Sequence, residues 1–201
     1  MSPSLAALVP IKSFADGKSR LEPALADHER AALAEKLAAS VVQACAPIPV
    51  YVACESDDVA TWAQAQGAAT IRGVAVGLNR VVQHGVAVLA AKGYERVLIA
   101  HGDLADPRNL AGLANWDGIV LVPDRRLKGT NVLIIPPDIG FRFSYGPGSF
   151  ARHLSEAERI DLPLHVIDDP GLALDLDEPD DLDAYVAAQA TDVEPPTARE
   201  R

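Results

Sequence analysis

Three basic residues, Lys12, Lys18 and Arg20, follow directly after an apolar run, residues 5–9, that predicts a first β-strand. In an open α/β sheet, ligands bind in the crevice outside the carboxyl ends of the strands. Fixed cations and the backbone N–H groups of a loop that contains Gly17 suit a polyphosphate. The whole chain has a formal net charge of −10, so this local positive charge needs a local reason. We therefore predict an anion site in this loop.

Acidic residues occur at two further places where strands or extended segments end. Asp103 follows the most hydrophobic run, residues 96–100, and Asp175 and Asp177 alternate with leucines. The alternation would place both carboxylates on one face of an extended segment, about 7 Å apart. Such carboxylates suit Mg²⁺, which takes oxygen ligands and bridges to phosphates. The alternative is that Asp103 caps a helix and that the acidic segment decorates a helix start, which Glu178 fits better.

Two loops with small and polar residues complete the set of candidate sites. Residues 123–131 join two predicted strands and end in Gly129, Thr130 and Asn131, although a solvated hairpin would look similar. Residues 141–150 contain Gly146 and Ser149 before a predicted helix. Free N–H groups at a helix start bind anions, whereas the alternative is that the serine only caps the helix. The five histidines are scattered, so the sequence offers no support for a covalent mechanism.

Alternating strand and helix patterns must position these loops. We expect strands at 5–9, 50–53, 69–71, 96–100, 118–122, 131–136 and 164–167. We expect helices at 27–45 with Asp27 as N-cap, and at 57–66, 78–92, 150–159 and 178–190. This alternation predicts βαβ units and a largely parallel sheet in a single domain, residues 1–189. Residues 190–201, which are rich in proline and charge, predict a disordered tail.

The composition limits the classes of partner. An acidic chain argues against nucleic acid and against an anionic membrane, since both bind basic surfaces. No apolar run approaches the ~20 residues of a membrane span, and no signal peptide is evident. Cys45 and Cys54 fit neither a metal site nor a disulfide framework, which indicates free thiols in a reducing compartment. We expect a soluble cytoplasmic protein.

Taken in order, these segments resemble one family. The motifs are Pro-x-Lys-x5-Lys-Ser-Arg-Leu from residue 10, Gly-Leu-Asn at 77–79, Gly-Asp-Leu at 102–104, Pro-Asp-Arg…Gly-Thr-Asn at 123–131, Tyr-Gly-Pro-Gly-Ser-Phe at 145–150 and Leu-Asp-Leu-Asp-x-Pro-x-Asp-Leu at 174–182. Together they are similar to the 2-phospho-L-lactate guanylyltransferases, which overlap with the phosphoenolpyruvate guanylyltransferases of coenzyme F420 biosynthesis. The resemblance runs from about residue 5 to residue 187. It implies a Rossmann-like nucleotidyltransferase fold, a three-layer α/β sandwich of the nucleotide-diphospho-sugar transferase type with a mixed, mostly parallel sheet.

The resemblance also implies a role for each motif. Lys12, Lys18 and Arg20 would hold the triphosphate of GTP, and Asn79 would lie near the nucleoside. Asp103, Asp175 and Asp177 would bind Mg²⁺, and Lys12, Lys18 and Asp103 would be catalytic. Thr130, Gly146 and Ser149 would hold a phosphorylated three-carbon acid. The family continues Gly-Asp-Leu with proline, whereas this chain has Ala105 and Asp106 there, and we give Asp106 no role.

The implied reaction is a direct displacement in which the acceptor phosphate attacks the α-phosphorus of GTP and pyrophosphate leaves. It needs positioning and charge neutralisation rather than a protein nucleophile. The expected acceptor is phosphoenolpyruvate or 2-phospho-L-lactate. The alternatives are a related transferase acting on 3-phosphoglycerate, a molybdopterin or a sugar phosphate, and a non-catalytic nucleotide-binding protein. Oligomeric state is left open, a homodimer being one option.

Overall fold

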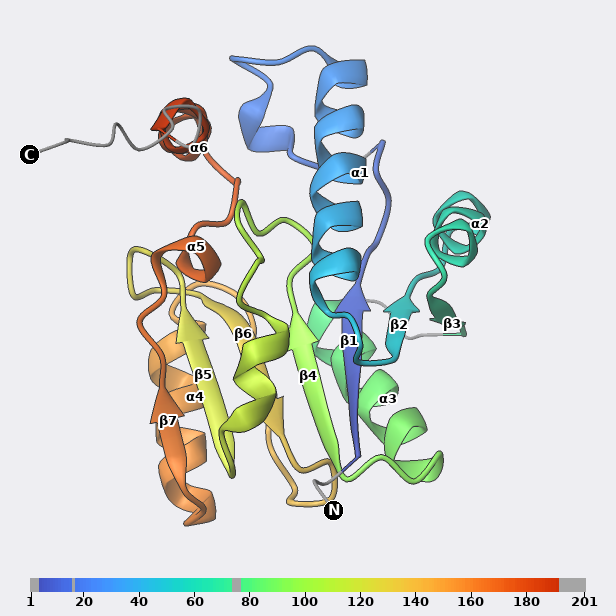
Figure 1. Ribbon diagram of the computed structural model, residues 1–201, viewed down its shortest axis with the longest axis vertical. Helices are drawn as coiled ribbons and strands as arrows, with labels where there is room; N and C mark the ends of the chain where they lie inside the picture. Colours follow the sequence, from blue (N-terminus) through green and yellow to red (C-terminus); the bar gives the residue numbers. More distant parts are fainter. Residues whose placement is uncertain (1–3, 16, 74–76, 192–201) are drawn as a thin grey trace, which may run out of the picture.

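A mixed seven-stranded sheet forms the centre of the molecule. The computed structural model describes residues 4–15, 17–73 and 77–191. The strands follow the order β3-β2-β1-β4-β6-β5-β7 across the sheet (Figure 1). Their bounds are β1 Leu5–Pro10, β2 Val50–Ala53, β3 Ala69–Ile71, β4 Arg96–Ala100, β5 Ile119–Pro123, β6 Thr130–Ile135 and β7 Leu164–Val166. Only β6 runs antiparallel to its neighbours, which confirms the predicted mixed, mostly parallel sheet.

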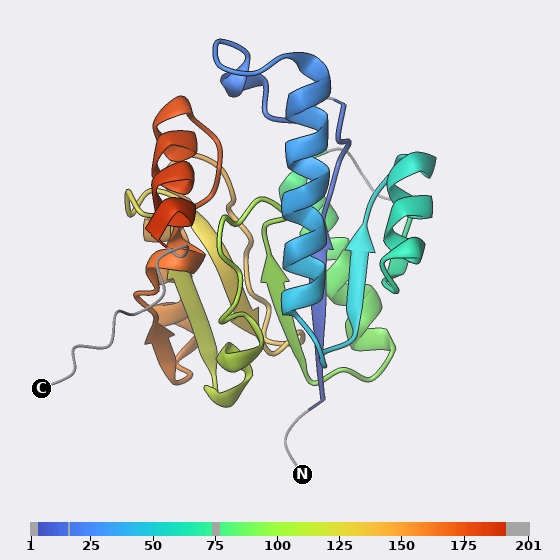
Figure 2. The same ribbon diagram turned by 45° about the horizontal axis from the view of Figure 1, so that its top comes forward.

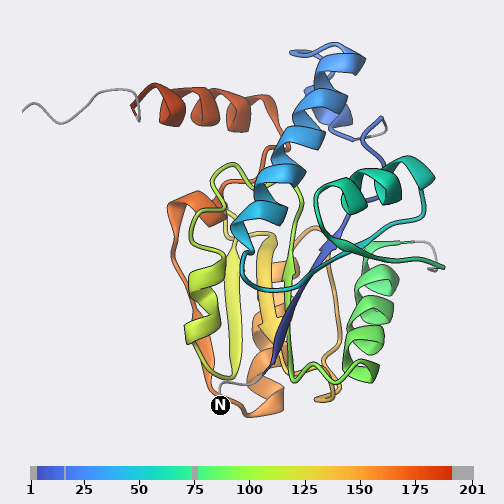
Figure 3. The same ribbon diagram turned by 45° about the vertical axis from the view of Figure 1, so that its right-hand side comes forward.

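Helices cover both faces of the sheet and make three layers (Figures 1 and 2). One face carries α1, α2, α5 and the short 3-10 helix η2, and the other face carries α3 and α4. The helices are η1 Ser19–Leu21, α1 Asp27–Ala44, α2 Asp57–Ala65, α3 Leu78–Ala91, η2 Ala111–Asn115, α4 Ser149–Ile160, α5 Pro170–Ala173 and α6 Pro179–Thr191. Helix α6 extends away from the sheet at the end where α1 begins (Figure 3).

Strand β1 shows how alternation in the sequence builds both cores. Ala7 and Val9 belong to the core under α1 and α2, whereas Ala6 and Leu8 belong to the core under α3. Side chains of a strand point alternately to opposite faces, so a strand covered on both sides is apolar throughout. Helix α3 crosses β1 closely at Gly85, where a Cβ atom would lie 2.6 Å from Leu8 Cδ2. The absence of a side chain permits this contact.

The antiparallel strand β6 decides which loops meet at one edge. Because β4 and β6 run in opposite directions, the start of β6 lies beside the end of β4, where His101 N donates to Asn131 O at 3.1 Å. The β5–β6 hairpin therefore reaches the edge at which the parallel strands end. The segment after β6 leads back to the same edge before α4 begins. Four loops far apart in the sequence converge there.

The predicted elements agree with the structure to within about two residues, with a few differences. Helix α1 begins at Asp27 rather than being capped by it, and Glu29 Oε2 accepts from the Ala26 N–H at 2.8 Å. Helix α2 is capped by Ser56, whose hydroxyl accepts from Val59 N. The short helices η1, η2 and α5 were not predicted, because each is too short to show a helical period.

Three further expectations concern the whole chain. Cys45 and Cys54 are both free, as predicted. Both are also buried, and burial raises the pKa of Cys45 to about 12. Within the described ranges, no helix is long and apolar enough to cross a membrane. The tail expected at residues 190–201 lies outside the described residues from position 192 onward.

Candidate active site

Two adjoining cavities, of about 320 and 300 Å³, open at the carboxyl edge of the sheet. Pro10, Ile11 and Leu78 line both of them. Polar residues of the first loop and of the β4 and α6 segments line the larger cavity, which includes Lys18, His101, Asp103 and Asp177. The other cavity is more apolar and includes Lys12, Cys54, Glu55 and Gly77. Sizes near 300 Å³ are at the lower end of the range for small-molecule sites.

Lys18 joins the first loop to two of the predicted carboxylates. Its Nζ atom pairs with Asp103 Oδ2 and lies 3.2 Å from Asp177 Oδ1. The side chain is only 5% exposed. Burial alone would lower the pKa of Lys18, but the two carboxylates outweigh burial and raise it, so the ammonium is charged. The Lys18 backbone is left-handed, with φ of 59°, a conformation that residues other than glycine rarely adopt.

Arg20 approaches the same acidic segment from the solvent side. Its Nη1 atom lies 3.7 Å from Asp177 Oδ2, and its side chain is 67% exposed. Lys12 is exposed and lines the smaller cavity. The structure thus brings Lys18 and Arg20 together with the carboxylates. Lys12 faces the neighbouring cavity.

Backbone hydrogen bonds join the loop of Asp103 to the segment of Asp175. Leu104 and Asp175 form an isolated antiparallel bridge, and Leu176 N donates to Asp103 O at 3.2 Å. Asp177 N also donates to Asp175 O, so the segment bends instead of staying fully extended as expected. Burial, followed by the charges of Asp103 and Asp177, raises the pKa of Asp175 to about 6. These mutual effects show that the three carboxylates share one electrostatic environment.

The residues present fit a divalent cation by their chemistry. Asp103 Oδ1 is buried and has no hydrogen-bond partner within the described residues. Burial would raise the pKa of Asp103, but Lys18 and His101 hold it below its usual range, so the carboxylate is ionised. Hard cations prefer such oxygens. Among the described residues, no three acidic, histidine or cysteine side chains lie close enough together to form a metal-ligand group, and Lys18 pairs with Asp103.

Asn131 and Asp181 support this acidic segment; the sequence placed Asn131 among the candidate polar residues of the hairpin loop but predicted no role for Asp181. Asn131 is 1% exposed, and its Nδ2 atom donates to Leu172 O at 3.0 Å and to Asp175 Oδ1 at 3.4 Å. Asp181 is fully buried, and its Oδ2 atom accepts from the N–H groups of Asp177 and Glu178 at 3.1 and 2.8 Å. An acidic residue in the first turn of α6 is the signal that could have indicated Asp181.

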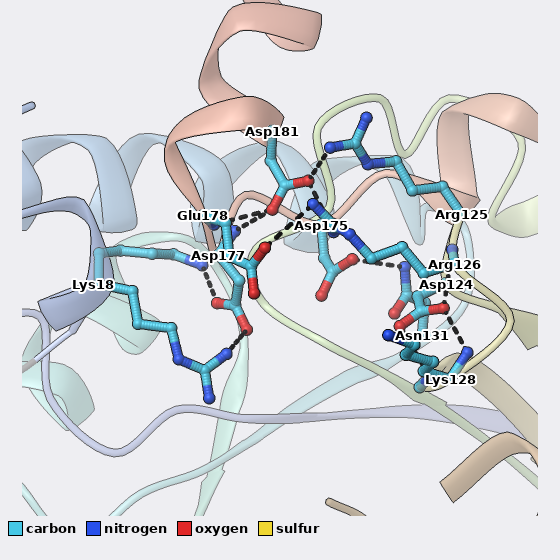
Figure 4. Close-up of polar contacts among 12 residues, drawn as sticks. Lys18, Asp124, Arg125, Arg126, Lys128, Asn131, Asp175, Asp177, Glu178 and Asp181 are labelled. Carbon is cyan, nitrogen blue, oxygen red and sulfur yellow. Dashed lines mark hydrogen bonds and ion pairs between the residues drawn. The ribbon is translucent and has the colours of Figure 1, made fainter. Parts of the chain in front are cut away.

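Two arginines of the β5–β6 hairpin, Arg125 and Arg126, pair with this acidic segment. Arg125 and Arg126 pair with Asp181 Oδ1 at 2.6 and 2.9 Å, and Arg126 also pairs with Glu178 at 3.2 Å (Figure 4). Asp124 folds the hairpin loop by accepting backbone N–H groups, including that of Gly129 at 2.7 Å. The hairpin is therefore a support for the segment that carries Asp175 and Asp177.

The loop before α4 is built differently from the expected open anion site. Helix α4 begins at Ser149, after Gly148 in a left-handed conformation, so the serine is not the N-cap. The N–H of Ser149 donates to Gly146 O at 2.9 Å, and that of Phe150 donates to Lys128 O at 3.2 Å. These two backbone donors, which the sequence predicts to be free, are therefore occupied.

Asn79 and Thr130 both make specific contacts with this part of the molecule. The Asn79 amide donates to Tyr145 O at 3.2 Å and accepts from Tyr145 N at 2.6 Å. It ties the start of α3 to the loop before α4. Thr130 is fully buried, and its Oγ1 atom lies 3.0 Å from His153 Nδ1. Asp106 pairs with Arg108 at 2.5 Å on the exposed side.

The mixed, mostly parallel seven-stranded sheet with helices on both faces is an α/β fold that matches solved nucleotide-diphospho-sugar transferase structures. A putative nucleotide-diphospho-sugar transferase from Desulfovibrio desulfuricans G20 has the same fold, with a TM-score of 0.77 at 16% identity over 95% of this chain and 90% of that chain. The chain belongs to the family of CofC-like guanylyl transferases, whose model matches residues 5–189.

Two similar proteins agree with this family assignment. A phosphoenolpyruvate guanylyltransferase from Conexibacter woesei is 37% identical over 190 residues, covering 89% of this chain and 85% of the relative. A protein of the same name from Rubrobacter xylanophilus is 35% identical, covering 89% of this chain and 92% of the relative. The protein is therefore a guanylyltransferase.

Proposed function

We propose that this guanylyltransferase transfers GMP from GTP to a phosphorylated three-carbon acid, phosphoenolpyruvate or 2-phospho-L-lactate, and so serves coenzyme F420 biosynthesis. Support comes from the family and from the two relatives named for phosphoenolpyruvate. The structural observation that carries the proposal is the buried Lys18 ammonium between Asp103 and Asp177, at the mouth of the larger cavity. A buried cation paired with carboxylates suits chemistry between two anions.

In this proposal the first loop binds the triphosphate. Lys18 and Arg20 lie beside the acidic segment, and Lys12 lies in the adjoining cavity. These cations would contact phosphate oxygens as point charges or forks. Lys12 and Lys18 would also stabilise negative charge as it develops on the leaving pyrophosphate. Asn79 would contribute to the nucleoside site indirectly, because its two hydrogen bonds to Tyr145 hold the start of α3 against the loop before α4.

Asp103, Asp175 and Asp177 are the residues that would hold Mg²⁺. The unpartnered Asp103 Oδ1 atom and the raised pKa of Asp175 both favour a cation near these carboxylates. When bound, the ion would offset phosphate charge and lower the repulsion between the two substrates. Asn131 and Asp181 would keep the carboxylates in place.

Thr130, Gly146 and Ser149 would hold the acceptor acid. A phosphate oxygen of the acceptor would attack the α-phosphorus of GTP and form a new P–O bond. The bond from that phosphorus to the α,β-bridging oxygen would break, and pyrophosphate would carry away its electron pair. No proton needs to move from the protein, because the attacking oxygen is already anionic. The residues contribute orientation and charge.

Pyrophosphate release tests this function. Purified protein with GTP and Mg²⁺ would be compared across phosphoenolpyruvate, 2-phospho-L-lactate and 3-phosphoglycerate, with ATP replacing GTP as the nucleotide control. Asp103→Asn should abolish release, whereas Asp106→Asn is the matched control, because Asp106 pairs on the exposed side with Arg108. Release with one of the first two acids and GTP would support the proposal. Silence with all three acids in folded protein would favour a non-catalytic nucleotide-binding protein.

A further inference from the structure

His153 is a fully buried histidine that the proposed reaction does not yet use. It lies in α4, with its ring 4.8 Å from that of Tyr145 and 5.7 Å from that of Phe141, centroid to centroid. Its two ring nitrogens contact two different acceptor-side segments, the start of β6 and the loop before α4. A buried ring that contacts two candidate binding segments can fix the orientation of the groups in both that would face a ligand.

The hydrogen bonds of His153 determine where its proton is. The backbone N–H of Ser144 donates to Nε2 at 2.9 Å, so Nε2 must carry a lone pair. Burial, together with the positive charge of Arg152, lowers the pKa of His153 to about 4, and the ring is neutral at physiological pH. A neutral imidazole has one N–H. That proton is therefore on Nδ1, which faces Thr130 Oγ1 at 3.0 Å.

This tautomer fixes the direction of the Thr130 hydroxyl proton. Because Nδ1–H donates to Oγ1, the hydroxyl oxygen is the acceptor in this contact and its own proton must point elsewhere. Within the described residues, the hydroxyl makes no second hydrogen bond. Thr130 is completely buried, and a buried donor without an acceptor is unfavourable in the free protein. An anionic oxygen of a bound acid would satisfy it.

We propose that His153 is a positioning residue that holds the Thr130 hydroxyl as a hydrogen-bond donor toward the acceptor acid. This inference rests on the proposed function, since it takes Thr130 as part of the acceptor site. The His153 ring also ties Ser144 to the same point, so one side chain links the strand start to the loop that leads to Gly146 and Ser149. The ligand is recognised by its anionic oxygen, either of a carboxylate or of a phosphate.

His153→Gln separates the two contacts of the ring. The Gln side-chain oxygen can reach the place of Nε2 and accept from Ser144, but nothing replaces the Nδ1–H donor. We expect the KM for the acceptor acid to rise about tenfold, the worth of one hydrogen bond to a charged group, while the KM for GTP changes less than about twofold. His165→Gln is the matched control. His165 lies in the edge strand β7 and makes its hydrogen bond with Asp117, away from Thr130 and Ser144.

A double-mutant cycle distinguishes positioning from general support. In a Thr130→Val background the hydroxyl is gone, so His153→Gln should raise the acceptor KM less than about twofold further. In a Thr130→Ser background, which retains a hydroxyl, the tenfold effect should persist. Equal factors in all three backgrounds would overturn the proposal, since they would indicate a purely structural role.

NMR of the unaltered protein provides a test that needs no variant. The ¹⁵N shifts of His153 should show a protonated Nδ1 and an unprotonated Nε2 at neutral pH. A ring protonated on Nε2 would overturn the proposal, whatever the variants do. If the unaltered protein transferred GMP to none of the acids, the proposed function would have failed, whereas activity combined with a flat mutant cycle would reject the role of His153 alone.

Discussion

Replacing Asp181 with asparagine should weaken both the fold and the site. The Asp181 carboxylate accepts backbone N–H groups from Asp177 and Glu178 and pairs with Arg125 and Arg126 (Figure 4). Asparagine preserves the size of the side chain and removes the charge. Its amide nitrogen would face guanidinium donors, and its carbonyl would accept the backbone bonds less strongly. The segment that carries Asp177 would lose its anchor.

The size of the effect follows from these contacts. Two charge-assisted bonds that become neutral cost together about 1 kcal/mol. The two ion pairs involve a carboxylate with no exposure and guanidinium side chains that are 33% and 29% exposed, so each contributes about 1 kcal/mol after screening. The total is about 3 kcal/mol, or a fall in melting temperature of about 6–12 °C for a chain of this size.

Thermal unfolding of Asp181→Asn beside Asp180→Asn tests this reasoning. Asp180 is exposed in the same first turn of α6, so the control removes the same charge from the same helix end. Asp181→Asn should also lower kcat/KM about tenfold at a temperature where it stays folded, because Asp177 is displaced. If the two variants melted within about 1 °C of each other, the anchoring role of Asp181 would be wrong.

Three further predictions concern the site and the core. Asp103→Asn should lower kcat/KM at least about 100-fold with an unchanged circular dichroism spectrum, and steady-state kinetics would check this. Gly85→Ala should destabilise by about 1–3 kcal/mol in urea unfolding, because its Cβ would lie 2.6 Å from a buried Leu8 methyl, whereas Gly112→Ala, which meets nothing within 4 Å, should change stability by less than about 1 kcal/mol. The pKa of His153 is lowered from 6.5 to about 4 in the folded protein, so the unfolded chain binds this proton first as pH falls. The stability from the neutral ring is therefore complete above pH 6.5 and is lost as pH falls toward 4, by about 2 kcal/mol at pH 5, and His153→Gln should flatten this dependence in urea titrations at pH 7.5 and 5.

Much of the fold could be predicted because the signals are local. The strands are apolar runs bounded by turn residues, and Gly67 and Gly93 both adopt positive φ where the sequence predicts helix ends. The order of the strands in the sheet, and the antiparallel direction of β6, depend on contacts between distant segments. A period in the sequence carries no information about which strand becomes the neighbour of β4.

The candidate site was predictable in its charges and less so in its supports. Lys18 and Asp103 follow strands, and Asp177 lies in an alternating segment. These residue types and positions predict that the three side chains lie close together. The sequence gives no partner for Arg125 and Arg126 in the hairpin loop and leaves His153 among scattered histidines. Their partners come from segments tens of residues away, and only the packed structure shows that these side chains are occupied with one another.

The order of the strands also keeps apart substitutions at two places along the carboxyl edge of the sheet, the end of β2 and the start of β6. Strands β2 and β6 are three positions apart in the sheet, which is about 14 Å at the usual spacing. Substitutions near the end of β2 and near the start of β6 are thus beyond the range at which mutational effects usually couple. If Thr130 holds the acceptor acid as proposed, the residues around it could change without altering the residues at the end of β2, which line the second cavity. Laboratory libraries confined to either half of this edge should combine additively for the same reason.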